Sequence, residues 1–131
     1  MSEINIELAR RYLEDVWNAK KREQIDVLLS DDFVDHHYPP EYPRGPEGAK
    51  MWFDYVTKAL PDINCEIKDV IADGDKVVVR YVLSGTHLGE LAGIPATNKK
   101  VSVPAVSIYY MDQGKIAECW VISGLIGAIK S

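Results

Sequence analysis

The sequence predicts an α+β domain in which three N-terminal helices pack on the concave face of one strongly curved antiparallel sheet of about four main strands. Two observations predict this class. Up to residue 60, apolar side chains recur every three to five positions, which is typical of amphipathic helices. After residue 62, apolar and polar side chains alternate in runs separated by short turns, which is typical of antiparallel strands. The domain is therefore expected to be a cone with a hollow inside.

Three segments carry the helical pattern. The first covers residues 4–17, and the second covers residues 20–29. The third covers residues 46–60, because Pro46 suits the first turn of a helix and Pro61 cannot continue one. Between the second and third helices, the segment FVDHHYPPEYPRGP contains four prolines. Prolines fix φ and remove backbone N–H donors, so this segment is expected to be an ordered loop.

Four segments carry the strand pattern, at residues 63–71, 76–87, 101–111 and 115–122. Turn sequences follow the first and third of them, with the glycine that such turns favour. Pro104 lies inside the third strand, where the apolar side chains change from odd to even positions. This change predicts a β-bulge at Pro104 that bends the sheet.

The length and charge of the chain limit what it can bind. Its 131 residues are expected to form a single domain, 1–131, which is long enough to bury a core without metal or disulfide. It carries 15 Lys and Arg residues against 20 Asp and Glu residues, a net charge of −5, and the basic residues are scattered. This argues against a nucleic-acid partner and against binding to an anionic membrane.

The compartment is predicted from the apolar runs and the cysteines. No apolar run approaches the ~20 residues that span a bilayer, and the N-terminus is not continuously apolar as a signal peptide would be. A cytoplasmic protein is therefore expected. Cys65 and Cys119 lie in separate apolar segments without CxxC spacing, so both are expected to be buried thiols, with a disulfide as the less favoured alternative.

Histidines are the candidate catalytic residues. His36 in the proline loop and His87 at a strand end are the stronger candidates, because imidazole exists in both protonation states near neutral pH. His37 should point away from His36 and is the weaker candidate. For all three, the alternative is a structural hydrogen bond. A metal site would need Asp35 and the three histidines to converge, and no metal is expected.

Aromatic residues are the candidate lining of the hollow. Tyr81 shares one strand face with His87, and Trp52 lies on the third helix. Trp120 is expected to be either a core residue or a flat wall for a ring-shaped ligand. The GxSxG, GxGxxG, P-loop and HExxH motifs do not occur, which argues against nucleotide binding and triad chemistry. The residues therefore favour a small, largely apolar ligand.

Several motifs carry a resemblance to a known family. They are FVDH, GPEG before the third helix, LPD after it, DGDKVVVRY, GTHLGELAGIPAT and GKIAECW. Together they resemble the SnoaL-like polyketide cyclase family of the NTF2-like superfamily, from about Tyr12 to Leu125. The resemblance implies an NTF2-like α+β cone with a deep pocket, a homodimer formed through the sheet, and no cofactor.

The family's chemistry carries over only in part. The resemblance implies ring closure of a polyketide by an intramolecular aldol reaction, with a carboxylate on the last strand as acid and base. That carboxylate is expected four residues after the last-strand tryptophan, where this chain has Gly124. The neighbouring Ser123 cannot accept a proton at neutral pH. The family's histidines match His36 and His87, which therefore remain the expected acid/base residues.

Three hypotheses follow for the function. The first is a cyclase-, isomerase- or lyase-type enzyme that acts on an apolar ketone or ester through His36 or His87, with Trp120 stacking on the substrate ring. The second is a binder or carrier of a small apolar metabolite, in which Gly124 only widens the pocket. The third is a protein-interaction module, which exposed Trp and Tyr side chains on the outer sheet would favour.

Overall fold

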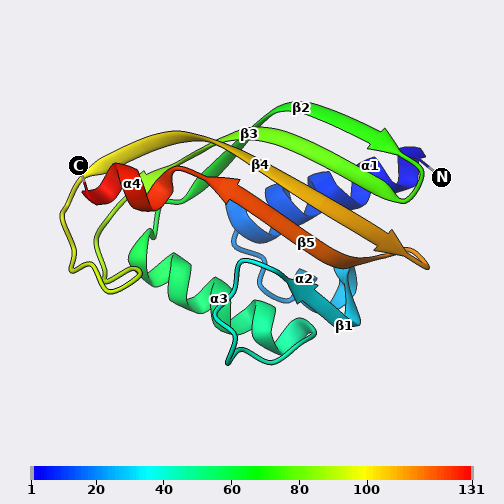
Figure 1. The fold of residues 1–131 in the computed structure, drawn as a ribbon, viewed down its shortest axis with the longest axis horizontal. Coiled ribbons are helices and arrows are strands. Elements are labelled where there is room, and N and C mark those ends of the chain that lie inside the picture. Colours follow the sequence, from blue (N-terminus) through cyan, green and yellow to red (C-terminus); the bar gives the residue numbers. More distant parts are fainter. Residues whose placement is uncertain (1, 131) are drawn as a thin grey trace.

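A computed structural model describes residues 2–130 of the protein. The elements follow one another along the chain in this order: α1 (Ser2–Arg11), the π-helix η1 (Tyr12–Asn18), α2 (Gln24–Leu28), β1 (Leu29–Asp35), α3 (Pro46–Ala59), β2 (Asn64–Asp73), β3 (Lys76–Thr86), β4 (Lys100–Asp112), β5 (Lys115–Ser123) and α4 (Leu125–Lys130). Figure 1 shows the long, curved strands passing in front of α1, with α3 below them. The predicted α+β class, with helices packed on one curved sheet, is confirmed.

The sheet has five strands rather than four, in the order β1-β5-β4-β3-β2. The four predicted strands pair antiparallel with their neighbours, whereas β1 pairs parallel with β5 at one edge. β1 was not predicted because apolar and polar residues do not alternate along its sequence, LSDDFVD, and its pairing with β5 shifts register between Leu29 and Val34. The helix predicted over 20–29 is correspondingly shorter, since only residues 24–28 are α-helical.

The predicted bulge at Pro104 is wrong. The pairing of β3 with β4 continues without a register shift through Val82 and Pro104. The pairing of β4 with β5 begins only at Ala105, so the missing N–H of Pro104 costs no hydrogen bond to β5. The register shifts lie instead between Ile67 and Asp69 in the β2–β3 pair and between Tyr110 and Met111 in the β4–β5 pair.

The apolar even positions of β4 have a different explanation. Ala105, Ser107, Tyr109 and Met111 are all buried, so the odd positions face the helices along this whole stretch. The even positions face outward, and they are also apolar. Both faces of β4 therefore carry apolar side chains. The change of apolar residues from odd to even positions does not indicate a bulge here.

The first predicted helix contains a π-helical segment, which orients aromatic residues. In a π-helix the repeat is i to i+5, so Tyr12 and Trp17 lie on one side of η1. Both side chains are buried, and they pack between the helices and the sheet. The largest fully buried side chains of this core are Tyr109, Phe33, Ile25, Leu28, Leu29, Leu60, Ile116 and Ile129.

The position of α3 is set at its N-terminus. Gly45 has φ +84°, and a Cβ built there would lie 2.3 Å from the carbonyl oxygen of Asp31, so only glycine fits this turn. The Gly45 N–H donates to the carbonyl of Phe33 on β1 at 2.7 Å. These contacts bring the start of α3 back against β1 and close the proline loop.

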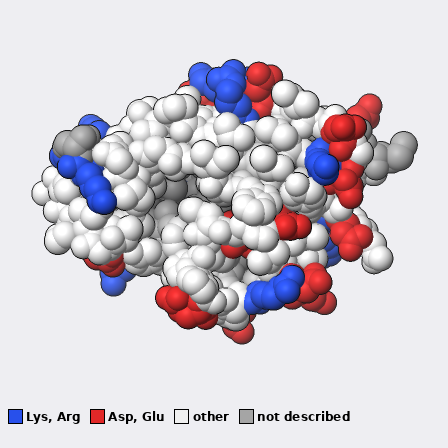
Figure 2. Space-filling view, in the orientation of Figure 1, with Lys and Arg blue, Asp and Glu red and all other residues white. Residues whose placement is uncertain are grey.

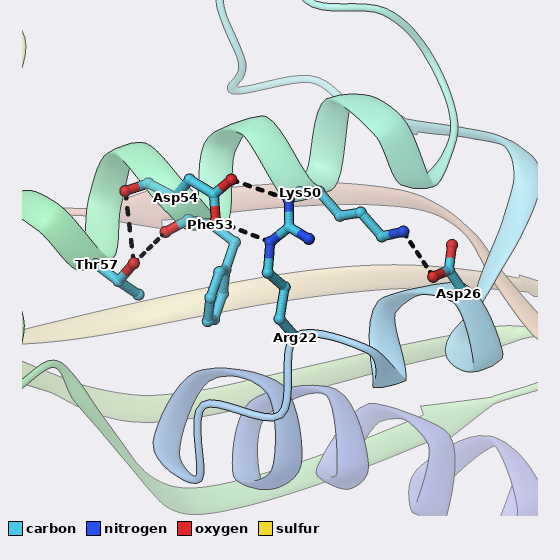
Figure 3. Close-up of polar contacts among 6 residues, drawn as sticks. All are labelled: Arg22, Asp26, Lys50, Phe53, Asp54 and Thr57. Atoms are coloured by element: carbon cyan, nitrogen blue, oxygen red, sulfur yellow. Dashed lines mark hydrogen bonds and ion pairs between the residues drawn. The ribbon is translucent and has the colours of Figure 1, made fainter.

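Charged side chains tie α3 to the segment around α2. The Arg22 guanidinium donates two hydrogen bonds to the Asp54 carboxylate, both at 2.9 Å, and the Lys50 ammonium lies 2.6 Å from the Asp26 carboxylate (Figure 3). Both pairs are solvent-exposed, so each contributes at most about 1 kcal/mol. They orient α3 more than they stabilise the fold.

The C-terminal helix α4 was not predicted from the sequence. It has six residues, LIGAIK, and its short apolar repeat was too brief to indicate a helix. Ile129 anchors it in the core with 1% of its surface exposed. No helix within residues 2–130 has the length and apolar character needed to cross a membrane.

Candidate functional site

A cavity of about 90 Å³ lies between the inner face of the sheet and the helices η1 and α3. Its lining residues are Tyr12, Leu13, Trp17, Asp35, His37, Trp52, Val56, Ile63, Cys65, Tyr81, Leu83, Ser107, Tyr109, Cys119, Val121, Ser123 and Leu125. Figure 2 shows the surface hollowed between the end of β5 and α3 and bordered there mainly by uncharged residues, whereas most charged side chains of this face lie near the outline of the molecule. The cavity is therefore mainly apolar, with few polar groups, as is typical of small-molecule sites.

Hydroxyl groups form the buried end of the cavity. Tyr81 on β3 and Ser107 and Tyr109 on β4 are 5%, 1% and 1% exposed. The Tyr81 hydroxyl lies 2.8 Å from the Ser107 Oγ, and the Tyr109 hydroxyl also interacts with Ser107. The strands place these groups together because Tyr81 pairs with Ala105, and Ser107 and Tyr109 follow on the same face of β4.

Asp35 and His37 form a second polar group on the cavity wall. Asp35 ends β1, and its side chain is 5% exposed, whereas the His37 side chain is 38% exposed. The His37 N–H donates to the Asp35 carboxylate at 2.9 Å, and the His37 Nδ1 lies 3.5 Å from the same oxygen. The carboxylate thus holds both the backbone and the ring of His37, at the more open part of the cavity.

Burial determines the protonation of the other titratable groups in the cavity. It raises the pKa of the hydroxyls of Tyr12, Tyr81 and Tyr109 above the usual value, and the nearby charge of Asp35 raises the first two further. Burial also raises the pKa of the Cys65 thiol to about 12. These groups are therefore neutral at physiological pH, and the tyrosines act as hydrogen-bond donors.

Both cysteines are free and buried, as predicted. Burial and the neighbouring Asp35 carboxylate raise the pKa of the Cys119 thiol, which hydrogen-bonds to that carboxylate. Because the thiolate is the nucleophilic form, neither cysteine is suited to covalent catalysis.

His36 lies outside the cavity. Its ring stacks on Trp120 with the ring centroids 3.9 Å apart, and its Nε2 pairs with the carboxylate of Glu118. The same ring borders a separate hollow of about 330 Å³ beneath the proline loop. The expectation that His36 and His37 point in opposite directions is met, with His37 rather than His36 at the cavity.

His87 is completely buried and does not line the cavity either. The Thr97 N–H donates to its Nδ1 at 3.3 Å, which requires an unprotonated Nδ1 and places the proton of the neutral ring on Nε2. The Thr97 Oγ1 lies 2.9 Å from the same nitrogen. These contacts hold the loop after β3 against the sheet, so the geometry of His87 corresponds to the structural alternative.

The remaining predicted ligand contacts divide into two groups. Trp52 and Tyr81 line the cavity as expected. Trp120 is 45% exposed on the outer face of the sheet, so it is neither a core residue nor a wall of the cavity. Gly124 does not line the cavity, and a Cβ built there would meet no atom within 4 Å. Ser123 is the residue at this end of β5 that lines it.

The residues that sequence reasoning undervalued are Asp35, His37 and Ser107. The available signal for Ser107 was the alternation along β4, which puts it on the face of Tyr109. For Asp35 and His37, the useful signal would have been recognition of a strand that ends at Asp35. That strand determines which side chains at the start of the proline loop point toward the cavity. Within residues 2–130, no group of three or more His, Cys, Asp or Glu side chains is arranged to hold a metal ion.

Comparisons with known proteins identify relatives over nearly the whole chain. The family model described as SnoaL-like polyketide cyclase matches residues 7–130. Aklanonic acid methyl ester cyclase DnrD of Streptomyces peucetius is 27% identical over 119 residues, which cover 86% of this chain and 79% of that protein.

Solved structures show the same fold. TsrD from Streptomyces laurentii has a TM-score of 0.86 and 25% sequence identity, with 97% of this chain and 92% of that chain covered. A candidate polyketide cyclase from Bacillus cereus has a TM-score of 0.79 and 31% identity, with 97% of this chain and 78% of that chain covered. Both structures therefore share this chain's arrangement of strands and helices over 97% of its length.

The buried tyrosines predict loss of stability at alkaline pH. Their pKa values are raised in the folded state above about 10, the value for an unfolded chain. The stabilisation is therefore complete below pH 10 and is lost as the pH rises above it. Absorbance at 295 nm reports phenol ionisation, and circular dichroism reports unfolding. The two transitions of these tyrosines should occur at the same pH. Ionisation of all tyrosines near pH 10 in a folded protein would contradict this burial.

Proposed function

The chain belongs to the SnoaL-like polyketide cyclase family, and from this premise we propose that it is an enzyme that removes a proton from a carbon next to a ketone or ester carbonyl. The relative DnrD is named as a methyl ester cyclase, which supports a cyclisation of this kind. The observation that carries the proposal is the Asp35–His37 pair on the wall of the cavity. We assign proton transfer to His37, and no proton-transfer step to His36 or His87.

His37 has the geometry of a general base oriented by a carboxylate. Its Nδ1 faces the Asp35 carboxylate, so a proton on Nδ1 is held there and Nε2 is left with its lone pair. The distance of 3.5 Å is long for a hydrogen bond, and such contacts in unliganded sites shorten when substrate binds. Asp35 therefore acts as a positioning residue that also stabilises the imidazolium once it forms.

The reaction can be written with its protons and electrons balanced. His37 Nε2 takes the proton from the carbon, and the electrons of the C–H bond form the C=C bond of an enolate, with the charge on the carbonyl oxygen. The enolate carbon attacks a second carbonyl carbon of the same molecule, which forms the ring bond and an alkoxide. The imidazolium returns its proton to the alkoxide, and the neutral base is restored. No carboxylate on β5 is needed, which accommodates Ser123 and Gly124.

Proton exchange at a carbon next to a carbonyl tests the assignment without knowledge of the natural substrate. NMR measures the incorporation of deuterium from D₂O into cyclopentanone. This incorporation should be faster in the presence of the protein than in buffer alone. The His37→Gln variant should reduce this acceleration by about a hundredfold or more. His36→Gln is the matched control, because the neighbouring imidazole lies outside the cavity, and it should retain the rate within a few-fold.

The outcomes separate the candidate functions. If His36→Gln abolishes exchange and His37→Gln does not, the assignment of the base is wrong. If cyclopentanone binds but wild-type protein does not accelerate the exchange, the proposed enzyme function is wrong, and the hypothesis of a carrier of a small apolar metabolite is favoured.

We also propose that two copies of the chain pair through the outer face of the sheet. One row of directly paired residues crosses four strands there: Ile71, Val78, Ile108 and Trp120. Ile71 is 62% exposed and Trp120 is 45% exposed, and Ile122 beside them is 66% exposed. A row of exposed apolar side chains is typical of a protein interface and supports the homodimer that the resemblance implies.

A charge in the middle of this face should prevent pairing. Light scattering coupled to gel filtration should give a dimer mass for wild-type protein and a monomer mass for Ile108→Glu. Val27→Glu places the same charge on α2, at a side chain that is 49% exposed away from the sheet, and should remain dimeric. A monomeric wild-type protein at micromolar concentration would rule out the dimer.

A further inference from the structure

The hydroxyl groups at the buried end of the cavity have no role in the proton transfer assigned to His37. Buried hydroxyls cost free energy unless they are hydrogen-bonded, and apolar side chains would fill the same space without that cost. Tyr81 and Ser107 satisfy one another at 2.8 Å, and Tyr109 interacts with the same serine. We call these three residues the hydroxyl cluster.

The hydroxyl cluster has more protons than it uses internally. Each hydroxyl carries one proton and can accept two hydrogen bonds. Tyr81 and Ser107 are joined by one hydrogen bond, which uses one of their two hydroxyl protons and leaves the other to be donated elsewhere. Tyr81 and Ser107 both line the cavity, so that proton can be donated to a ligand there.

The cluster also remains a donor throughout the physiological pH range. Burial raises the pKa of Tyr81 and Tyr109 above the ordinary value for a phenol, so neither ionises near neutral pH. The cavity contains the Asp35 carboxylate but no Lys or Arg side chain among its lining residues. A ligand oxygen that accepts a hydrogen bond is therefore favoured at the cluster, and a fully charged carboxylate is not.

The dimensions of the cavity indicate what reaches the cluster. A cavity of about 150 Å³ holds benzene, so by proportion about 90 Å³ holds about four non-hydrogen atoms. That is a carbonyl group with one carbon on each side of it, so the other two ring carbons of a probe such as cyclopentanone would lie toward the opening of the cavity at the surface. The cluster lies at the buried end of the cavity and His37 at its more exposed part, so a carbonyl oxygen directed at the cluster would leave the adjacent carbon toward His37.

We propose that the Tyr81–Ser107 hydroxyl pair is a binding site for the carbonyl oxygen of a ketone or ester and for the enolate oxygen formed from it. The choice of a ketone or ester as the ligand rests on the proposed function. The inference adds the hydroxyl pair to the Asp35–His37 pair as a second part of the site. When the C–H bond breaks, negative charge develops on this oxygen, and the hydrogen bond from the cluster strengthens. A donor positioned for the charge that develops in the transition state lowers the barrier.

The carbonyl stretching frequency of a bound ketone reports this hydrogen bond directly. Cyclopentanone labelled with ¹³C at the carbonyl is the probe, read by infrared difference spectroscopy with wild-type protein. The band should shift to lower frequency than in a hydrocarbon solvent, because a hydrogen bond weakens the C=O bond. Tyr81→Phe removes only the hydroxyl, and Ser107→Ala removes its partner, so each should lose most of this shift. Each should also weaken binding about fivefold, the effect of one hydrogen bond.

Tyr12→Phe is the matched control. Tyr12 lines the same cavity but is not part of the hydroxyl cluster, so this variant should keep the shifted band. An unshifted band in wild-type protein, an equal shift in Tyr81→Phe, or no binding of cyclopentanone would each overturn the proposal. A shifted band without catalysed deuterium exchange would retain the carbonyl site and remove the enzymatic function, so the two failures are distinguishable.

Discussion

The pairing of β1 with β5 is the contact on which the site depends. Asp35 lies opposite Cys119, and the His36 N–H donates to the Cys119 carbonyl at 3.0 Å. Because side chains alternate along a strand, this register turns Asp35 inward and His36 outward onto Trp120. A shift of one residue would exchange the two faces and place an imidazole in the core. The position of His37 then follows from its two contacts with the Asp35 carboxylate.

The interior of the sheet combines tight packing with a small number of polar groups. Val77, Val79, Ile116 and Leu28 are fully buried, whereas the hydroxyl cluster and Asp35 occupy the part of the core that borders the cavity. Buried polar groups are tolerated where they are hydrogen-bonded, and the Tyr81–Ser107 pair and Asp35 have such partners, on a neighbouring strand and on the adjoining loop. The polarity is therefore concentrated where a ligand can use it.

Much of the fold could be predicted from the sequence, because short turns join β2 to β3 and β4 to β5 and because β3 alternates regularly. That alternation correctly placed Tyr81 on the inner face of β3, and His87, just after the end of β3, is also buried. The same reasoning was insufficient for Trp120, since both faces of β5 carry apolar residues and only its pairing with β4 shows which face is inside. It was insufficient for Asp35 and His37 because β1 pairs parallel with a strand about 80 residues further along the chain, and no local pattern encodes that contact. The choice of Gly124 as a cavity residue failed for a similar reason, as Ser123 has the inward position.

The central claim is that the cavity beneath β3, β4 and β5 is the ligand site. Backbone amide chemical-shift mapping with ¹⁵N-labelled protein tests it most directly, by titration with cyclopentanone. We predict that the largest shifts occur at Tyr81, Ser107, His37 and Val121, which come from four separate segments that all line the cavity. Shifts confined to Tyr42 and Arg44 would instead place the ligand in the hollow under the proline loop. Shifts confined to Ile108, Trp120 and Ile122 would place it on the outer face of the sheet, and either result would contradict the account.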